Sequence, residues 1–518
     1  MGNPVPEVPV SQFPTVTPFG LVLFAGLLTG CPNPKNPLGP PVEPPVTPAS
    51  AIAFAIGGPG ADLVRAVVTD AAGNVFVTGE FTGTADFDPS DATHAFTSLG
   101  GTDLFLARYS PIGELTWVVR IGDAPDESVT ALAIDNAGNL VLGGSFVGTV
   151  DFDPEAGVTT ATSNGGRDGF VASYTPAGAF RWVRTVGGPA DDAVLDVAAQ
   201  AGGVIFASGT FSGTAVVDPA QSLAVTSAGG VDGFLASWSP TGTARWAFSV
   251  GGPGDDAASA VAAGAGGSVY LGGAFTGTAD FGPGTETASL TSPGGLDGFL
   301  ARYSDGGALT WLQGLSGPDN VEVTRGGLAV GTDGAVYAGG TFAGTADFDG
   351  GSGVAARTSN GLTDGFLVRY EAAGTFGWVV AIGGPNADLI RGVATAPSGD
   401  AVITGSFSGT ARFDPGAGAA SLTAIGLAGA TDAFTAQYGP TGGFRWAVGL
   451  GAPVAGSESG SFGAAVAVDG NGFVFTGGQF FGAADADPGS GLVVLTSLGG
   501  ADGFVVKYTG SGALATRP

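Results

Sequence analysis

The sequence contains few of the side chains on which most enzymatic and metal-binding chemistry depends. Its 518 residues include one cysteine, Cys31, and one histidine, His94. A single cysteine cannot build a disulfide framework within the chain. So few Cys and His residues also argue against zinc sites and against catalytic triads that need a histidine. His94 occurs in one copy of a repeated unit, and we interpret it as a loop residue.

Basic residues are also scarce. There are 17 Lys and Arg against 45 Asp and Glu, which gives a formal net charge of −28. Such a surface repels phosphate backbones, so we expect no nucleic-acid partner. It attracts divalent cations strongly only where several oxygens converge. Self-repulsion favours solubility, and we expect a monomer.

Long hydrophobic runs are absent apart from "FGLVLFAGLLTG" at residues 19–30, which is too short to span a bilayer. This run ends at Cys31 as "LLTGC" and resembles the bacterial lipobox. The resemblance implies that residues 1–30 are a lipoprotein signal peptide and that Cys31 is acylated. One feature departs from the signal-peptide pattern, because residues 1–18 contain no Lys or Arg. Pro32 follows the cysteine in place of the Asp that, by the family resemblance, would favour retention in the inner membrane. We therefore expect an exported protein, anchored by lipid in the outer membrane or at the cell surface.

Residues 31–50 form a proline-rich tether, with eight prolines among twenty residues. Such a segment favours extended polyproline II and spans on the order of 60 Å at about 3.1 Å per residue. A stiff tether of this kind would hold the following domain away from the membrane surface.

From residue 51 to residue 518 the chain repeats one unit seven times. The landmark "DGF", or a close variant, begins at Asp103, Asp168, Asp232, Asp297, Asp364, Asp432 and Asp502. Consecutive landmarks are 65, 64, 65, 67, 68 and 70 residues apart. Each unit contains four short apolar segments separated by Gly- and Asp-containing turns, with an insertion between the second and third, which predicts four strands.

The strands of each unit are apolar on both faces, so each sheet must be covered on both sides. Radial packing of four-stranded sheets does this, and the sequence predicts an all-β, seven-bladed β-propeller. The last unit lacks its fourth strand, whereas "AIAFAIGG" at 51–58 matches "RWAFSVGG" at 245–252. We therefore expect residues 51–56 to join the C-terminal blade, beside Phe504, and to close the ring.

Units such as "GGLDGFLARYSDGGALTW" resemble the bacterial seven-bladed β-propeller repeat, often called the SBBP repeat. The resemblance covers about residues 51–512. It implies a propeller of the kind found in exported and surface proteins, and it implies no reaction and no catalytic residue.

The insertion carries an Asp-x-Asp pair in four copies, and Ca²⁺ is the candidate cofactor. The pairs are Asp86/Asp88, Asp151/Asp153, Asp347/Asp349 and Asp485/Asp487. Two carboxylates on one side of an extended segment could share a Ca²⁺ ion. The other copies have Val216, Gly282 or Arg412 in the pair, which is a poor fit to an essential metal. We favour an Asp-Pro turn in which the carboxylate accepts backbone N–H groups.

Two other repeated positions have structural interpretations. The aspartates of the seven "DGF" landmarks are expected to hold the insertion to the start of the third strand through a hydrogen bond. The fourth strand carries a tryptophan in six copies: Trp117, Trp182, Trp246, Trp311, Trp378 and Trp446. We expect these tryptophans to pack between blades.

Three functions remain open at this point. The first is a non-enzymatic, lipid-anchored envelope protein that binds or scaffolds an unknown protein or glycan ligand. The second is Ca²⁺-dependent adhesion or glycan binding on an acidic face, formed by the insertions and the links between units. The third is a glycoside hydrolase that uses paired carboxylates, with the irregular segment 451–463 as the best candidate for a distinct site.

Overall fold

The computed structural model describes residues 51–517, apart from 124–125, 154–156, 415–419, 428 and 454–455. The predicted signal peptide and the whole predicted tether, including Cys31, lie outside the described residues. Within the described part, strands dominate and the helices are two 3₁₀ turns, η1 (Pro219–Gln221) and η2 (Ala265–Gly267). No described helix is long and apolar enough to cross a membrane.

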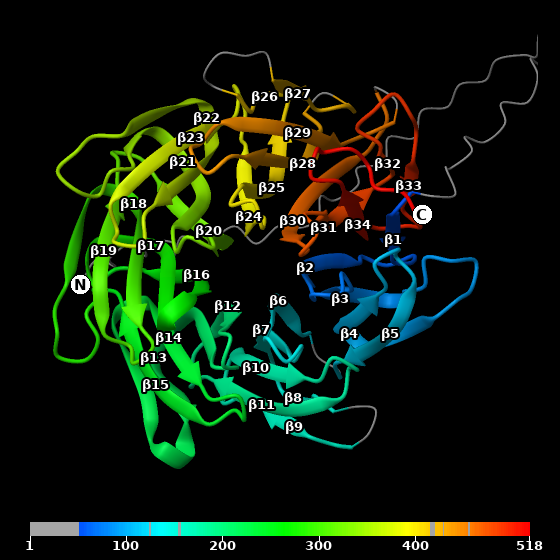
Figure 1. The fold of residues 1–518 in the computed structure, drawn as a ribbon. Coiled ribbons are helices and arrows are strands. Elements are labelled where there is room, and N and C mark those ends of the chain that lie inside the picture. The colour runs from blue at the N-terminus through cyan, green and yellow to red at the C-terminus, as the bar shows by residue number, and fades with distance from the viewer. Residues whose placement is uncertain are drawn as a thin grey trace, which may run out of the picture. The chain divides into compact units, whose positions relative to one another are not determined.

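Seven four-stranded antiparallel sheets form the blades of a β-propeller, as the repeat predicts (Figure 1). The first three blades, in chain order, are β2 (Leu63–Thr69), β3 (Val75–Asp86), β4 (Ala95–Tyr109) and β5 (Leu115–Ile121); β6 (Ser128–Ile134), β7 (Leu140–Phe146), β10 (Asp168–Tyr174) and β11 (Phe180–Val186); and β12 (Ala193–Ala199), β13 (Ile205–Asp218), β14 (Leu223–Trp238) and β15 (Ala244–Val250).

The next three blades follow the same order. They are β16 (Ala257–Gly264), β17 (Ser268–Asp280), β18 (Ser289–Ser304) and β19 (Leu309–Leu315); β20 (Val321–Val330), β21 (Val336–Asp347), β22 (Ala356–Tyr370) and β23 (Phe376–Ile382); and β24 (Leu389–Thr395), β25 (Ala401–Ser408), β28 (Thr431–Tyr438) and β29 (Phe444–Leu450).

The seventh blade combines the two ends of the repeat region. It consists of β30 (Gly460–Val468), β31 (Val474–Phe481), β34 (Asp502–Tyr508) and the N-terminal β1 (Ala53–Ile56). In three blades the insertion forms a separate small ribbon: β8 (Thr149–Asp151) with β9 (Thr160–Thr162), β26 (Thr410–Arg412) with β27 (Ser421–Thr423), and β32 (Ala483–Asp485) with β33 (Val494–Thr496).

The predicted ring closure is confirmed. Strand β1 pairs antiparallel with β34, and Ala55 lies opposite Phe504. The first strands of adjacent blades contact one another around the full ring, including β30 with β2. The described residues contain seven clusters of buried hydrophobic side chains, each shared between two adjacent blades. Burial between blades is therefore the common core of the fold.

The tryptophans of the fourth strands lie at the joints between blades. Trp182 donates its indole N–H to the carbonyl of Pro240 in the next blade at 3.2 Å. A Cβ built on Gly242, which has φ +77° in that turn, would lie 2.7 Å from the Trp182 ring. Trp246, Trp311, Trp378 and Trp446 make the equivalent hydrogen bond, to Asp305, Ala372, Pro440 and Gly510. Trp117 makes the same ring contact with Gly178, without a partner for its indole N–H in the described residues.

The closing joint uses different side chains for the same contact. Ile52 and Phe54 lie against Gly113 in the first blade, at the place where the other joints have tryptophan. Phe54 also packs on Tyr109, with 4.7 Å between ring centroids. Lys507 of β34 donates to the carbonyl of Pro111 at 2.9 Å. The joint between first and last blade is thus held by burial and by a cross-blade hydrogen bond, as at the other joints.

We expect Phe54→Ala to lower the free energy of unfolding by about 3 kcal/mol, because it removes a buried ring from the closing joint. Chemical denaturation followed by tryptophan fluorescence measures this change. Phe481→Ala is the matched control, since Phe481 is 43% exposed and its loss should cost less than about 1 kcal/mol. Equal midpoints for the wild type and Phe54→Ala would show that β1 does not hold the ring closed.

Candidate functional site: the central channel

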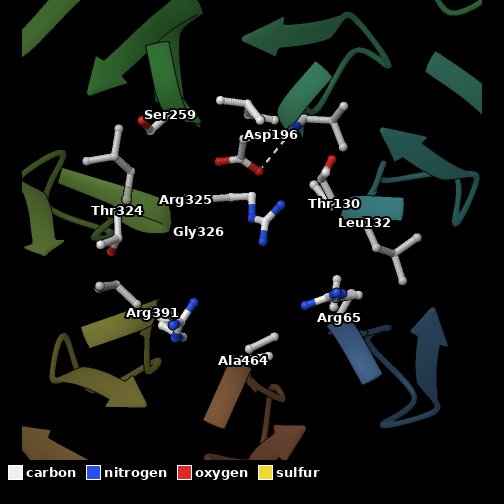
Figure 2. A pocket seen from close by; sticks show the side chains of 18 of the residues that line it. Arg65, Thr130, Leu132, Asp196, Ser259, Thr324, Arg325, Gly326, Arg391 and Ala464 are labelled. Atoms are coloured by element: carbon white, nitrogen blue, oxygen red, sulfur yellow. Dashed lines mark hydrogen bonds between the residues drawn. The ribbon is translucent and has the colours of Figure 1, made fainter. Parts of the chain in front are cut away.

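Every blade has a β-bulge in its first strand, at an equivalent position. The register shifts between Val64 and Ala66 in β2, for example, and leaves Arg65 without a residue opposite it in β3. Corresponding shifts occur in the other six first strands. A bulge adds a residue to one strand and reorients its side chain. Here the bulged residues line the channel at the ring's centre (Figure 2).

The channel contains a cavity of about 460 Å³ to which the first strands of all seven blades contribute. The bulge residues that line it are not of one type. Three blades present arginine and four present other residues: Arg65, Thr130, Leu195, Ser259, Thr324 with Arg325, Arg391 and Ala464. Structural positions such as the "DGF" aspartate keep one residue type in all seven units. The channel therefore departs from the sevenfold pattern.

The fifth blade has a longer bulge than the others. Four residues, 324–327, separate the pair Val323–Gly340 from the pair Leu328–Ala338. In β2 the corresponding pairs are Val64–Gly79 and Val67–Val77, and only Arg65 and Ala66 lie between them. Gly326 adopts φ +69°, a left-handed conformation that glycine accommodates without strain. Thr324 donates its hydroxyl to the carbonyl of Ile390 at 2.7 Å, which fixes the bulge to the sixth blade.

Three arginines from separate blades point into this channel (Figure 2). Arg65 forms an ion pair with Glu80 at 3.0 Å, and Glu80 also accepts the hydroxyl of Ser128. The guanidinium groups of Arg325 and Arg391 have no hydrogen bond or ion pair within the part of the chain that the structure describes. Both side chains remain accessible from the channel, because Arg325 is partly exposed and Arg391 is exposed.

Burial and mutual repulsion disfavour the charges of these arginines. Burial lowers the pKa of Arg325 to about 10, with further lowering by Arg65 and Arg391. Burial also lowers the pKa of Arg391, again with repulsion from Arg65. Both groups stay protonated at neutral pH, so the channel keeps unpaired positive charge inside a strongly acidic protein.

Two carboxylates that line the channel, Asp196 and Glu322, do not neutralise this charge by direct contact. The two oxygens of Asp196 accept the backbone N–H groups of Val197 and Val261, each at 2.9 Å. Burial raises the pKa of Asp196 to about 7 and also raises the pKa of Glu322. Part of the negative charge in the channel is therefore lost near neutral pH, whereas the arginines keep theirs.

The predicted metal-binding aspartates lie in the insertions, away from the channel lining. One oxygen of Asp86 accepts the backbone N–H groups of Asp88 and His94. The first aspartates of the other pairs, Asp151, Asp347 and Asp485, make the same two bonds within their own insertions. Asp280 also makes them, in a unit where Gly282 replaces the second aspartate. The first carboxylate thus shapes the turn with or without its partner.

The second aspartate of each pair donates its backbone N–H to the carboxylate of the first; these residues are Asp88, Asp153, Asp349 and Asp487. Among the described residues, no group of three or more His, Cys, Asp and Glu side chains could hold a metal ion. The Ca²⁺ hypothesis therefore gains no geometric support in these segments.

The aspartates of the "DGF" landmarks are buried at the base of the insertions. Six of the seven accept a backbone N–H group in the last part of their insertion, as Asp103 does from Leu99 at 3.1 Å. Asp297 cannot do so four residues upstream because Pro293 has no N–H, and it accepts from Gly317 instead. These bonds join the insertion to the third strand, as the sequence suggests.

The second oxygen of each "DGF" aspartate is buried without a hydrogen-bond partner in the described residues. At five joints a second acid from the link between blades lies near it: Asp502 with Asp62, Asp103 with Glu127, Asp168 with Asp192, Asp232 with Asp256 and Asp364 with Asp388. Burial raises the pKa of Asp62 to about 7, and like-charge repulsion adds to the shift. Burial raises the pKa of Glu127 to about 9.

Links and insertions lie on the same face, as predicted, because Gly57 bridges to Asp86 and equivalent bridges recur at five other joints. Many acids on this face are the buried groups with raised pKa values, so its charge is weaker than the residue count suggests. The opposite turns also carry acids, such as Asp70, which accepts the N–H groups of Ala72 and Asn74. The acidic residues are thus distributed over both faces.

The channel arginines are the residues that sequence reasoning missed. A signal was present: Arg65 and Arg391 interrupt otherwise apolar strands, "LVRAVVT" and "LIRGVAT". The longer spacing of 67 residues between Asp297 and Asp364 also indicated an insertion, which contains Arg325. Residue spacing alone did not show that these positions meet.

Comparisons with known proteins add little to this description. No family model matches the chain. The resemblance to the SBBP repeat therefore stays a prediction. A regulatory protein of Caulobacter vibrioides, FlaEY, is 24% identical over 188 residues, which is 35% of this chain and 18% of that protein. The crystal structure of rhamnogalacturonan lyase YesW covers 76% of each chain at 11% identity, with a TM-score of 0.24.

The buried carboxyl groups predict that the propeller is more stable at pH 5 than at pH 8. Asp168, Asp232, Asp388 and Asp502 have pKa values raised to about 6, chiefly by burial. A raised pKa means that the folded state binds the proton more tightly than the unfolded state. The resulting stability is complete below the ordinary pKa of 3.8 and is lost as the pH rises from there to about 6. Melting temperatures across this range measure the effect.

Asp168→Asn tests one of these pairs. The amide oxygen can still accept the N–H of Asn164, and the repulsion from Asp192 is removed. We expect the variant to be more stable than the wild type by about 1–2 kcal/mol at pH 8 and to show a smaller pH dependence. Asp91→Asn, an exposed change of the same charge, should leave both unchanged. A destabilised Asp168→Asn protein at pH 8 would contradict this explanation.

Proposed function

We propose that this chain is a non-enzymatic binding protein whose propeller is presented at the bacterial cell envelope by a lipid on Cys31. The observation that carries the binding role is the channel, where three bulges present arginine and the other four do not, while the structural positions repeat in all seven blades. A propeller with a purely structural role would need no unpaired arginines at its axis. Such charges reduce the stability of the unliganded fold, which is typical of functional sites.

The scaffold is suited to holding such a site in place. Each blade is fixed to its neighbours by buried side chains and by cross-blade hydrogen bonds such as that from Trp182. Residues on different blades, which are far apart in the sequence, therefore keep fixed relative positions around the axis. Sites on rigid elements hold their binding groups more accurately than sites on loops.

The envelope location rests on the sequence "LLTGC" before the proline-rich segment. A cysteine that carries several acyl chains can hold a protein at a membrane stably. The resemblance to SBBP repeats, which occur in exported and surface proteins, agrees with this location. The tether would allow the propeller to meet ligands away from the bilayer.

Metabolic labelling with a radioactive fatty acid tests the anchor. We expect the full chain, expressed in a bacterium, to incorporate label and to sediment with membranes. Cys31→Ser should remove the label and leave the melting temperature of the propeller unchanged, because Cys31 lies outside the repeat region. Unlabelled wild-type protein that stays in the soluble cytoplasmic fraction would contradict the proposed location.

A further inference from the structure

We infer that the central channel binds a small oxyanion, phosphate or a small molecule bearing a phosphate group, between Arg325, Arg391 and Arg65. This inference rests on the proposed binding function and names its ligand class. Arginine suits this role because its planar guanidinium donates paired hydrogen bonds to carboxylate and phosphate oxygens.

The geometry supplies converging donors with free capacity. Arg65 comes from the first blade, Arg325 from the fifth and Arg391 from the sixth, and all three line the same cavity. Arg65 is oriented by Glu80. Arg325 and Arg391 have no protein partner in the described ranges, so all their donors remain available. The channel walls partly desolvate both charges, and an anion would supply the partner that the protein does not.

The bulge in the fifth blade is the feature that brings Arg325 into position. Without the two extra residues, the segment would pair as in the other blades and present a single bulge residue, as β2 presents Arg65. The hydroxyl of Thr324 and the left-handed Gly326 stabilise the longer path. A local insertion that adds an unpaired arginine to a channel already containing two indicates a function for that charge.

The size and charge of the surroundings restrict the ligand. A cavity of about 460 Å³ accepts a small molecule and excludes a folded chain or a nucleic-acid duplex. The net charge of −28 opposes the approach of large polyanions. A small anion, in contrast, can reach the arginines at physiological salt, because the surface field is screened beyond about 8 Å.

The two channel carboxylates give the site a pH dependence. Burial raises the pKa of Asp196 to about 7, so this group changes charge near neutral pH. The groups that face the channel around it are Arg65, Glu322, Arg325 and Arg391. Protonation of Asp196 removes negative charge beside the arginines, so anion affinity should rise as the pH falls from 8 to 6.

Calorimetric titration with inorganic phosphate, against sodium chloride at matched ionic strength, tests the inference. We expect saturable binding of one phosphate per chain to the wild type. Arg325→Gln and Arg391→Gln should each weaken this binding about tenfold or more, since each removes charge-assisted hydrogen bonds. Arg357→Gln, which removes the same charge from the outer part of the fifth blade, should bind phosphate like the wild type.

Thermal unfolding separates a binding role from a structural one. Without phosphate, Arg325→Gln should melt at the same or a higher temperature than the wild type, because an enclosed and unpaired charge is removed. Added phosphate should raise the melting temperature of the wild type and of Arg357→Gln, but not of Arg325→Gln.

Three results would overturn the inference: no phosphate binding by the wild type, equal binding by the wild type and both channel variants, or a lower melting temperature of Arg325→Gln in phosphate-free buffer. None of these results bears on the acylation of Cys31. Conversely, a chain without acyl label would contradict the envelope location and leave the channel site intact. Failure of the inference and failure of the proposed location are therefore distinguishable.

Discussion

The fold depends on the burial of apolar blade faces against neighbouring blades. Each sheet is hydrophobic on both sides, so no blade is stable unless it is covered twice, and a closed ring covers every face. One strand from the N-terminal end of the repeat region completes the last blade, so closure and blade assembly are the same event. At six joints a tryptophan packs on a turn glycine of the next blade, and at the seventh Ile52 and Phe54 do so.

Buried carboxyl groups also lie at the joints between blades. A "DGF" aspartate connects the insertion to the third strand in six of the seven units, and at five joints a second acid follows in the link. The backbone bonds to these carboxyl groups fix the loops, while their burial and mutual repulsion raise their pKa values. The same residues therefore order the insertions and make stability depend on pH.

Side chains at the centre of the ring are not constrained by packing between blades, unlike those at the joints. A bulged residue has no residue opposite it and faces the channel, so its side chain can change without disturbing the packing between blades. Seven equivalent bulges thus provide seven positions for a site, and three of them carry arginines. In a protein with so few basic residues, three that meet at one axis form a local reversal of charge.

The sequence by itself determined the all-β class, the seven blades and the closing strand, because a repeat with two apolar faces and an incomplete last unit has one simple packing solution. It also indicated the roles of Asp103 and its equivalents, whose hydrogen bonds are local. The channel site was decided by the tertiary structure. Arg65, Arg325 and Arg391 are separated by up to 326 positions and meet only because the ring brings the first strands to one axis. Their orientation depends on bulges, and strand register is set by pairing with the next strand, which the pattern of apolar residues does not specify.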